Sequence, residues 1–304
     1  VRSRRQRQMC IRDSLGTALK AAFAEAGDQV RTIGRRHADA CWGEDLTTVL
    51  DGADAVVNLA GRSVSCRYTK TNADEIFRSR TRTTRELGRA LAACDSPPPV
   101  WLNSSTGTIY ADSRHSPQDE EHGELGDGFS VEVARAWERE LWEAPTSVRR
   151  TALRTSIVLG HGGALNPLIN LARIGFGGTE GDGGQLFSWI HIDDVYGVID
   201  HIINTPSLEG PVNLATPHAV PNAELMATVR RVFGRSFGIP LPAWSLEAGA
   251  RIIQTEAELV LKSRWVHPKR LLDSGYTFRH PTLPEALEDL ATRTPRGLLR
   301  VQLG

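Results

Sequence analysis

Residues 14–36 constrain the fold of this chain more than any other part of its sequence. Their apolar side chains recur from Leu15 to Ala26 at the three- and four-residue spacing of a helix with one buried face. Gly27 then ends the helix, because glycine adopts the left-handed backbone conformation without a steric penalty. Residues 30–33 follow as a short strand. A helix that leads directly into such a strand is typical of the second half of a nucleotide-binding βαβ unit.

Two arginines, Arg35 and Arg36, stand at the end of this strand. In a dinucleotide-binding fold that end faces the adenosine ribose. An acidic residue there binds the 2′-hydroxyl of NAD, whereas a pair of arginines suits the 2′-phosphate of NADP by charge and by forked hydrogen bonding. The pattern therefore indicates either an NADP site or a helix–turn–strand with two solvated arginines, and these residues alone do not separate the two.

Residues 1–13 lack the apolar strand and the glycine-rich turn that precede the helix in such a unit. They contain five arginines and one acidic residue, whereas a central parallel strand is a near-continuous apolar run. The segment RQRQMCIRDS resembles translated sequencing-adapter read-through. We therefore interpret residues 1–13 as non-native and the first strand as missing, with a basic arm for an anionic partner as the alternative. Without the first two glycines, we expect weak or absent coenzyme binding by this chain.

Composition excludes several classes of protein. Lysine plus arginine and aspartate plus glutamate both number 36, so no general attraction to nucleic acid or to a membrane surface is expected. No apolar run approaches the roughly 20 residues that a membrane span requires. The four cysteines lack CxxC spacing, which argues against a zinc or disulfide framework and predicts a cytoplasmic protein. The partner that remains is a small molecule.

Strands alternate with helices through about residue 160, which predicts an α/β fold with a doubly wound, Rossmann-like parallel sheet. The expected strands lie at 53–61, 100–106 and 151–159, and the expected helices at 46–50, 72–93 and 130–143. The arginine-rich stretch 78–85 reads as the solvent-exposed face of its helix. We divide the chain into a non-native segment (1–13), an NADP-binding domain (14–165) and a smaller substrate lobe (166–304).

The second half has a more irregular pattern. Residues 175–184 contain six glycines, which predicts a mobile lid, a substrate-facing hairpin or a bland flexible loop. Asp193 is expected to cap the helix that follows it. The remaining elements are expected at 168–174 (helix), 211–215 (strand), 221–233 and 246–261 (helices), 276–278 (strand) and from 283 (helix), with a frayed end from 294.

Small and hydroxyl-bearing residues follow two of the predicted strands. Asn58, Ala60 and Gly61 end the first, where small residues let a dinucleotide approach the backbone. Ser104, Ser105 and Thr106 end the next, where ligand-contacting hydroxyls belong in an open parallel sheet. Plain core strands that finish in turn-forming residues are the alternative.

With these segments placed, the chain resembles the extended or atypical short-chain dehydrogenase/reductase group, in its epimerase family branch with a C-terminal domain of unknown function. The stretches FSWIHIDDV and TEAELVLKSRWV are the most specific for that branch. Other matching stretches, in order between about residues 14 and 290, are SLGTALKAAFAEAG, DAVVNLAGRSV, IFRSRTRTT, NSSTGTIY, GFSVEVARAWE, LRTSIVLGHGGAL and GPVNLATPHAVPN.

The resemblance implies a role for each matching residue. Gly16 corresponds to the last glycine of the phosphate turn, and Arg35 and Arg36 to the NADP 2′-phosphate site. Thr106 is the best match to the active-site hydroxyl, with Ser105 a close competitor. The other residues that the resemblance places along the coenzyme are Asn58, Ala60, Gly61 and Ser104.

One departure from the superfamily concerns its chemistry. The Tyr-x-x-x-Lys pair, in which the lysine charge lowers the phenol pKa, occurs nowhere in this sequence. The resemblance aligns Glu138 with a downstream glutamate, which puts Ser130 and Ala134 where the pair belongs. A proton donor would have to come from Tyr110, His191 or Asp193. We therefore expect either an NADP-dependent oxidoreductase or epimerase-like protein with a non-standard proton donor, or a non-catalytic NADP-binding sensor.

Overall fold

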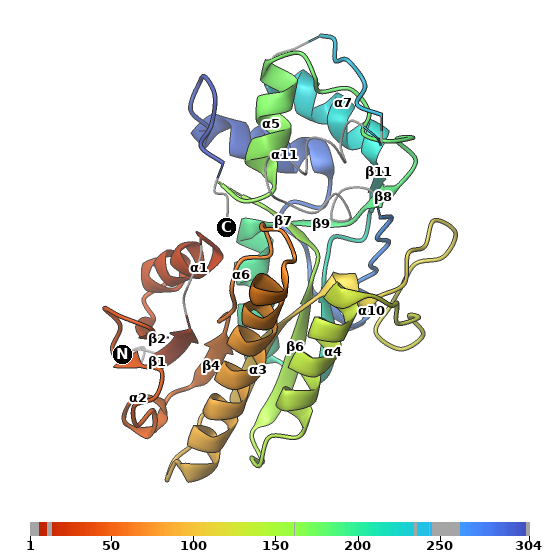
Figure 1. The fold of residues 1–304 in the computed structure, drawn as a ribbon. Coiled ribbons are helices and arrows are strands. Elements are labelled where there is room, and N and C mark those ends of the chain that lie inside the picture. Colours follow the sequence, from red (N-terminus) through yellow and green to blue (C-terminus); the bar gives the residue numbers. More distant parts are fainter. Residues whose placement is uncertain are drawn as a thin grey trace.

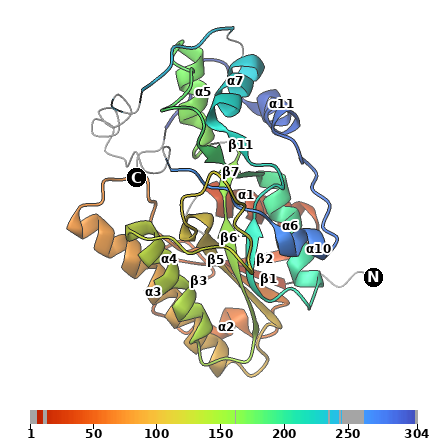
Figure 2. The same cartoon turned by 90° about the vertical axis from the view of Figure 1, so that its right-hand side faces the viewer.

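The computed structural model describes residues 6–10, 14–160, 162–233, 236–242, 244 and 262–301. These residues form a seven-stranded parallel sheet, helices on both of its faces, and a smaller lobe beyond the carboxyl ends of its central strands (Figure 1, Figure 2). The predicted α/β fold with a doubly wound sheet is confirmed. The helix predicted over 246–261 lies outside the described residues. No helix in the described part of the chain is long and apolar enough to cross a membrane.

The sheet has the strand order β10-β6-β5-β4-β1-β2-β3, and all neighbouring strands are parallel. The order reverses at β1, which is the switch point beside which dinucleotide-binding folds hold their ligand. The strands are β1 (Gln6–Cys10), β2 (Gln29–Gly34), β3 (Ala40–Cys41), β4 (Ala55–Asn58), β5 (Val100–Thr106), β6 (Arg149–Thr155) and β10 (Gly210–Leu214). Because β10 comes from beyond residue 165, the second half of the chain completes the sheet.

The expectation that residues 1–13 supply no central strand is wrong for the backbone of residues 6–10. Gln6–Cys10 form β1, which pairs with β2 on one side and β4 on the other. Parallel pairing uses only backbone N–H and C=O groups, so the polar character of a segment does not by itself exclude it from this place. The interpretation of residues 1–13 as non-native stays a prediction.

Helices cover both faces of the sheet (Figure 2). Along β4, successive side chains point to opposite faces, so Val57 enters one core and Val56 the other. The core around Val57 includes α1 (Ser14–Glu25) and α6 (Ile192–Asn204). The core around Val56 includes α2 (Thr47–Leu50), α3 (Lys70–Ala93) and α4 (Phe129–Trp142). Thr69 caps α3, because its side chain accepts a hydrogen bond from the backbone N–H of Asn72.

The lobe packs three helices around its own core, and Figure 1 shows them at one end of the sheet. These helices are α5 (Leu165–Arg173), α7 (Asn222–Phe233) and α11 (Leu283–Arg293), with strand pairs β7 (Ile157–Leu159)–β9 (Trp189–His191) and β8 (Leu186–Phe187)–β11 (Val220–Pro221). The continuous strand predicted over 151–159 is wrong. The N–H and the hydroxyl of Ser156 both donate to the carbonyl of Leu214, at 3.0 and 2.7 Å, and β7 then leaves the main sheet.

The glycine-rich segment 175–184 is attached to residues 239–241 by backbone hydrogen bonds. Gly178 donates to the carbonyl of Ile239 at 3.1 Å, and Leu241 donates to that of Thr179 at 2.8 Å. A Cβ atom at Gly178 would overlap the backbone of Ile239 and Pro240, so the glycine allows this close approach. The segment is therefore paired with a second backbone stretch, and its role toward a substrate stays a prediction.

The C-terminal segment is fastened to α6 by one buried carboxylate. Asp194 is fully buried and accepts hydrogen bonds from the N–H groups of Arg279 and His280 and from the Tyr276 hydroxyl, at 2.7, 2.9 and 3.1 Å. A Cβ atom at Gly197 would overlap that hydroxyl, so this glycine makes room for the tyrosine.

Two predictions for the C-terminal segment are wrong. Residues 276–278 form no strand, because side-chain bonding to α6 rather than backbone pairing holds Tyr276 after the short helix α10 (Lys269–Asp273). The end of the chain is not frayed as far as residue 301. The side chain of Asn170 on α5 bonds both the carbonyl and the N–H of Leu299, each at 2.8 Å.

Candidate functional site

The exposed arginine pair lies at the carboxyl end of β2. Arg35 and Arg36 follow the buried Gly34 in a turn that the N–H of Asp39 closes by donating to the carbonyl of Thr32 at 3.0 Å. Neither arginine side chain forms a hydrogen bond or ion pair with another residue in the described part of the chain. The turn therefore presents two adjacent guanidinium groups to solvent, on the edge where the parallel strands end.

Asn58 shapes the end of β4 and does not reach outward. Its side chain is fully buried, and its amide nitrogen donates to Asn103 Oδ1 at 2.6 Å and to Thr84 Oγ1 at 3.3 Å. Its Oδ1 accepts the N–H of Ala60 at 3.1 Å. Both ends of the amide are thus engaged inside the protein. Asn58 fixes the backbone of Ala60 and Gly61, and any contact with a ligand at this place falls to those two residues.

The three hydroxyls at the end of β5 alternate between the two faces of the sheet. Ser105 is buried, and its hydroxyl donates to Glu138 Oε1 on α4 at 2.6 Å. Ser104 and Thr106 point to the other face and are half-buried. Thr106 Oγ1 caps the short 3-10 helix η1 (Gly107–Ile109), accepting the N–H of Thr108 at 3.2 Å. Between the two competitors for the active-site hydroxyl, Thr106 is the more accessible.

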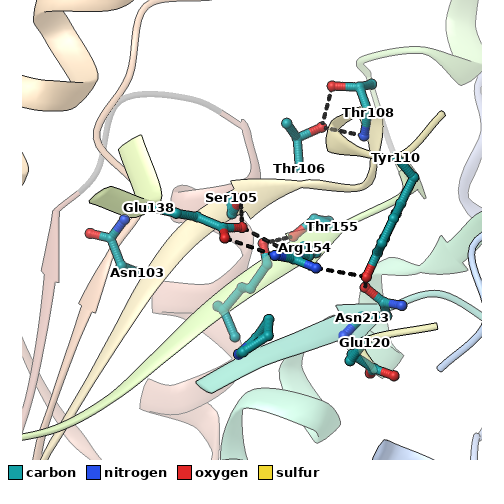
Figure 3. Close-up of polar contacts among 12 residues, drawn as sticks. Asn103, Ser105, Thr106, Thr108, Tyr110, Glu120, Glu138, Arg154, Thr155 and Asn213 are labelled. Carbon is teal, nitrogen blue, oxygen red and sulfur yellow. Dashed lines mark hydrogen bonds and ion pairs between the residues drawn. The ribbon is translucent and has the colours of Figure 1, made fainter. Parts of the chain in front are cut away.

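A chain of buried polar side chains runs from β5 to β10 (Figure 3). Glu138 receives the Ser105 hydroxyl and forms two hydrogen bonds with Arg154 of β6, each at 2.9 Å. Arg154 donates in turn to the Tyr110 hydroxyl at 2.9 Å, and that hydroxyl donates to Asn213 Oδ1 at 2.9 Å. The network connects four elements of the sheet and its helices behind the carboxyl edge.

Tyr110, a candidate proton donor from the sequence, belongs to this network. Its side chain is only 1% exposed and its hydroxyl both accepts and donates a hydrogen bond. Burial raises the pKa of Tyr110, and the Arg154 guanidinium opposes that rise only in part. Tyr110 is therefore hydrogen-bonded inside the protein and is not exposed at a ligand-binding surface.

The helix that carries the Tyr-x-x-x-Lys pair in the wider superfamily has no equivalent proton donor here. Ala134 is fully buried and packs with Tyr110 and Val131. Ser130, which the resemblance aligns with the tyrosine, is half-buried near the start of α4. On the same alignment the small apolar side chain of Ala134 stands where the lysine would lower the phenol pKa.

His191, another candidate proton donor, is fully buried and caps α6. Its Nδ1 accepts the N–H of Asp193 at 3.1 Å. The prediction that Asp193 caps this helix is therefore wrong: Asp193 lies in the first turn, and the preceding imidazole provides the acceptor. Because Nδ1 accepts, the proton of the neutral ring is on Nε2, which lies 3.4 Å from Asp289 Oδ2.

His191, Asp193, His280 and Asp289 place four possible metal-binding atoms within 4.8 Å of one another. The protonated Nε2 of His191 has no lone pair to offer a metal ion. Arg293 lies 2.6 Å from the Asp289 carboxylate and 3.6 Å from that of Asp193, so it already supplies a positive charge. These contacts favour the interpretation of the four residues as a charge cluster that connects α6 to α11, rather than as a metal site.

We expect acidic pH to lower the stability of the folded protein, because His191 becomes protonated. Burial, reinforced by the charge of His280, lowers the pKa of His191 to about 4, although Asp193, Asp289 and Asp194 oppose the shift. A group with a depressed folded-state pKa favours folding above its unfolded value, near 6.5, and that contribution is lost as the pH falls toward 4. We expect the free energy of unfolding to fall by about 3 kcal/mol across this window, as measured by urea denaturation at successive pH values.

The control for this prediction is His191→Asn, which keeps a side-chain acceptor for the cap but does not titrate. Its stability should change much less between pH 6.5 and 4 than that of the unsubstituted chain. Equal pH dependence in the two proteins would show that His191 does not govern the loss.

Gly16 lies buried in the first turn of α1. Residues 11–13, which connect β1 to this helix, are outside the described part of the chain. The structure therefore places the predicted last glycine of the phosphate turn at a helix start beside the switch point, where backbone N–H groups favour an anion.

Arg154 and its pairing with Glu138 and Tyr110 were missed by sequence reasoning. The available signal was a single charge in the otherwise apolar strand TALRTSIVL. Such a residue is rarely buried unless it is paired, so a search for a buried acidic partner would have been justified.

Comparisons with known proteins agree with this geometry. The sequence model described as the NAD dependent epimerase/dehydratase family matches residues 13–215. The model of a domain of unknown function, DUF1731, matches residues 241–290. The first match contains the sheet strands from β2 to β10, and the second contains α10 and the start of α11.

Several relatives are similar over nearly the whole chain. The human epimerase family protein SDR39U1 is 31% identical over 283 residues, which are 91% of this chain and 96% of that protein. A crystal structure of human SDR39U1 (isoform 2) with NADPH has a TM-score of 0.86 at 30% identity and covers 95% of this chain and 100% of its own. A nucleoside-diphosphate sugar epimerase from Corynebacterium glutamicum has a TM-score of 0.76 at 28% identity, over 95% of this chain and 59% of its own.

Proposed function

This chain belongs to the NAD-dependent epimerase/dehydratase family, and from that premise we propose that it binds NADP(H) as the coenzyme of an oxidoreductase acting on a small molecule. The observation that carries the proposal is the exposed, unpaired couple Arg35 and Arg36 at the carboxyl end of β2. Two cations at this place match the extra phosphate that distinguishes NADP from NAD. The human relative crystallised with NADPH supports the same coenzyme.

The residues at the edge of the sheet fit such a molecule. Arg35 and Arg36 would hold the 2′-phosphate, and the start of α1 around Gly16 would face the pyrophosphate. Ala60, whose backbone N–H is bonded to Asn58, and Gly61 leave the backbone accessible along the line in which the coenzyme would extend.

When bound, the nicotinamide supplies hydride transfer. This chain's contribution would be to position the substrate and to move a proton. We propose Thr106, the best match to the active-site hydroxyl, as the group that handles this proton, because its side chain is half-buried at the end of β5 and Thr108 orients its hydroxyl. Glu138 would affect this edge only indirectly. It accepts the hydrogen bond of the Ser105 hydroxyl and so keeps that hydroxyl directed into the protein.

We expect the double substitution Arg35→Ala/Arg36→Ala to weaken NADPH binding by about 10- to 100-fold while leaving NADH binding within a few-fold, because a charge-assisted hydrogen bond contributes about 1.5–3 kcal/mol. Titration of the nicotinamide fluorescence measures both affinities. Since residues 1–13 lack the glycine-rich turn, the titration is run on this chain and on a version in which an apolar strand and a GxxG turn precede the start of α1.

Arg31→Ala is the matched control, because it changes another arginine of the same strand before its carboxyl end. Equal affinity for NADPH and NADH in the unsubstituted protein would contradict the proposal. So would an absence of NADPH binding in both versions.

A second candidate is a non-catalytic NADP(H)-binding sensor. It is favoured by the places of Tyr110 and His191, since both are buried and hydrogen-bonded inside the protein. A screen of carbonyl substrates for loss of nicotinamide absorbance separates the two. Turnover that Thr106→Ala abolishes supports the oxidoreductase. Tight NADPH binding without turnover across a broad screen supports the sensor.

A further inference from the structure

One arginine of the stretch expected to face solvent is folded inward. Along α3, Arg78, Arg82 and Arg85 are exposed as predicted, whereas Arg80 is half-buried. Its Nη1 donates to the backbone carbonyls of Arg62 and Ile76, at 3.0 and 3.1 Å. This one side chain therefore departs from the solvent-exposed face, and two fixed acceptors set its direction.

The Arg80 guanidinium lies against the carboxyl edge of the sheet. A Cβ atom at Gly61 would lie 3.2 Å from its Cζ and 3.4 Å from each Nη atom. Gly61 is the third residue after the end of β4 and one of the residues expected along the coenzyme. Only a glycine at this place leaves room for the planar group at its present distance.

An aromatic ring supports the same guanidinium. Its Cζ lies 4.9 Å from the centroid of the Trp137 ring on α4, a cation–π distance. The Trp137 indole N–H donates to Thr84 Oγ1 at 3.0 Å, which fixes the ring. Arg80 is thus held by a ring, two carbonyls and a glycine before any ligand arrives, and such preorganisation lowers the cost of binding.

We propose that Arg80 binds an oxyanion group, a phosphate or a carboxylate, of the molecule held at the carboxyl ends of β4 and β5. A planar guanidinium with several fixed donors suits such a group. The anion has two possible sources, the pyrophosphate of the coenzyme or an acidic group of the substrate. The inference rests on the proposed function for the coenzyme source, but the anion chemistry can be tested separately.

The test uses the full chain with Arg80→Gln, which removes the charge, and Arg80→Lys, which keeps it without the fork. Arg82→Gln is the matched control, since it removes an exposed arginine from the same helix. NADPH affinity is measured by nicotinamide fluorescence. Binding of inorganic phosphate is measured as the rise in thermal unfolding temperature, with and without saturating NADPH.

If the anion belongs to the coenzyme, Arg80→Gln weakens NADPH binding by about 10- to 100-fold, Arg80→Lys has a smaller effect, and Arg82→Gln has almost none. If it belongs to the substrate, NADPH affinity is retained. Phosphate then stabilises the NADPH-saturated unsubstituted protein but not Arg80→Gln.

Unchanged NADPH affinity together with unchanged phosphate stabilisation in Arg80→Gln would overturn the proposal. So would an absence of phosphate stabilisation in the unsubstituted protein with unchanged NADPH affinity. If neither this chain nor the version with the restored turn binds NADPH, the proposed function fails. The phosphate comparison on the free chain then decides the role of Arg80 alone: a loss specific to Arg80→Gln supports it, and no difference overturns it. Arg80→Lys, which keeps the cation–π contact, serves in place of Arg80→Gln if the latter fails to fold.

Discussion

Glu138→Ala is expected to lower the free energy of unfolding by about 3–5 kcal/mol, because it leaves the buried charge of Arg154 without its partner. The two side chains are only 10% and 8% exposed, and two hydrogen bonds join them. The same substitution removes the acceptor of the Ser105 hydroxyl. Urea denaturation followed by far-UV circular dichroism measures the change.

Glu140→Ala is the matched control on the same helix. Glu140 pairs with Arg85, whose side chain is 52% exposed, and exposed pairs contribute about 0–1 kcal/mol. A loss from Glu138→Ala no larger than that from Glu140→Ala would mean that solvent or another group compensates Arg154. The double substitution Glu138→Leu/Arg154→Leu should recover part of the lost stability, because it removes the unpaired charge.

Asp194→Ala is expected to cost about 3–5 kcal/mol, because it removes a buried carboxylate that accepts three hydrogen bonds, each worth about 1–3 kcal/mol. The donors are the N–H groups of Arg279 and His280 and the hydroxyl of Tyr276. The loss should be accompanied by faster hydrogen exchange at the amides of residues 279 and 280. The substitution thereby tests whether one carboxylate fastens the C-terminal segment to α6.

The control is Asp193→Ala, one residue earlier in the same helical turn. Asp193 is partly exposed, and the ion pairs at its Oδ2 span 3.6–4.0 Å. We expect a loss of about 1 kcal/mol or less. If the two substitutions cost the same, the buried hydrogen bonds of Asp194 do not explain the attachment.

The helices and most strands were predictable because they depend on local periodicity. The apolar spacing of residues 72–93 and 130–143 placed α3 and α4 to within two residues of their observed bounds. The elements that failed were those in which a side chain replaced backbone pairing. Tyr276 is held by Asp194, and the turn at Ser156 is held by Leu214. Neither contact leaves a periodic signal in the sequence.

The candidate site was predicted in part. The sequence located Arg35, Arg36 and Thr106 on the edge where strands end, because strand and turn signals determine that edge. It did not distinguish Arg80 from its exposed neighbours, nor show that Asn58, Tyr110 and His191 face inward. Inward or outward direction depends on which elements pack together, and Tyr110 and Asn213, which share one hydrogen bond, are 103 positions apart in the chain.

By itself, the sequence determined the α/β class, the family and the position of the arginine couple that we propose selects the coenzyme, since each follows from local spacing or from a contiguous motif. Only the tertiary structure decided which polar groups form hydrogen bonds inside the protein and which remain accessible to a ligand. The physical reason is that a buried donor or acceptor must find a partner, and for Ser105 and Tyr110 that partner lies on another element.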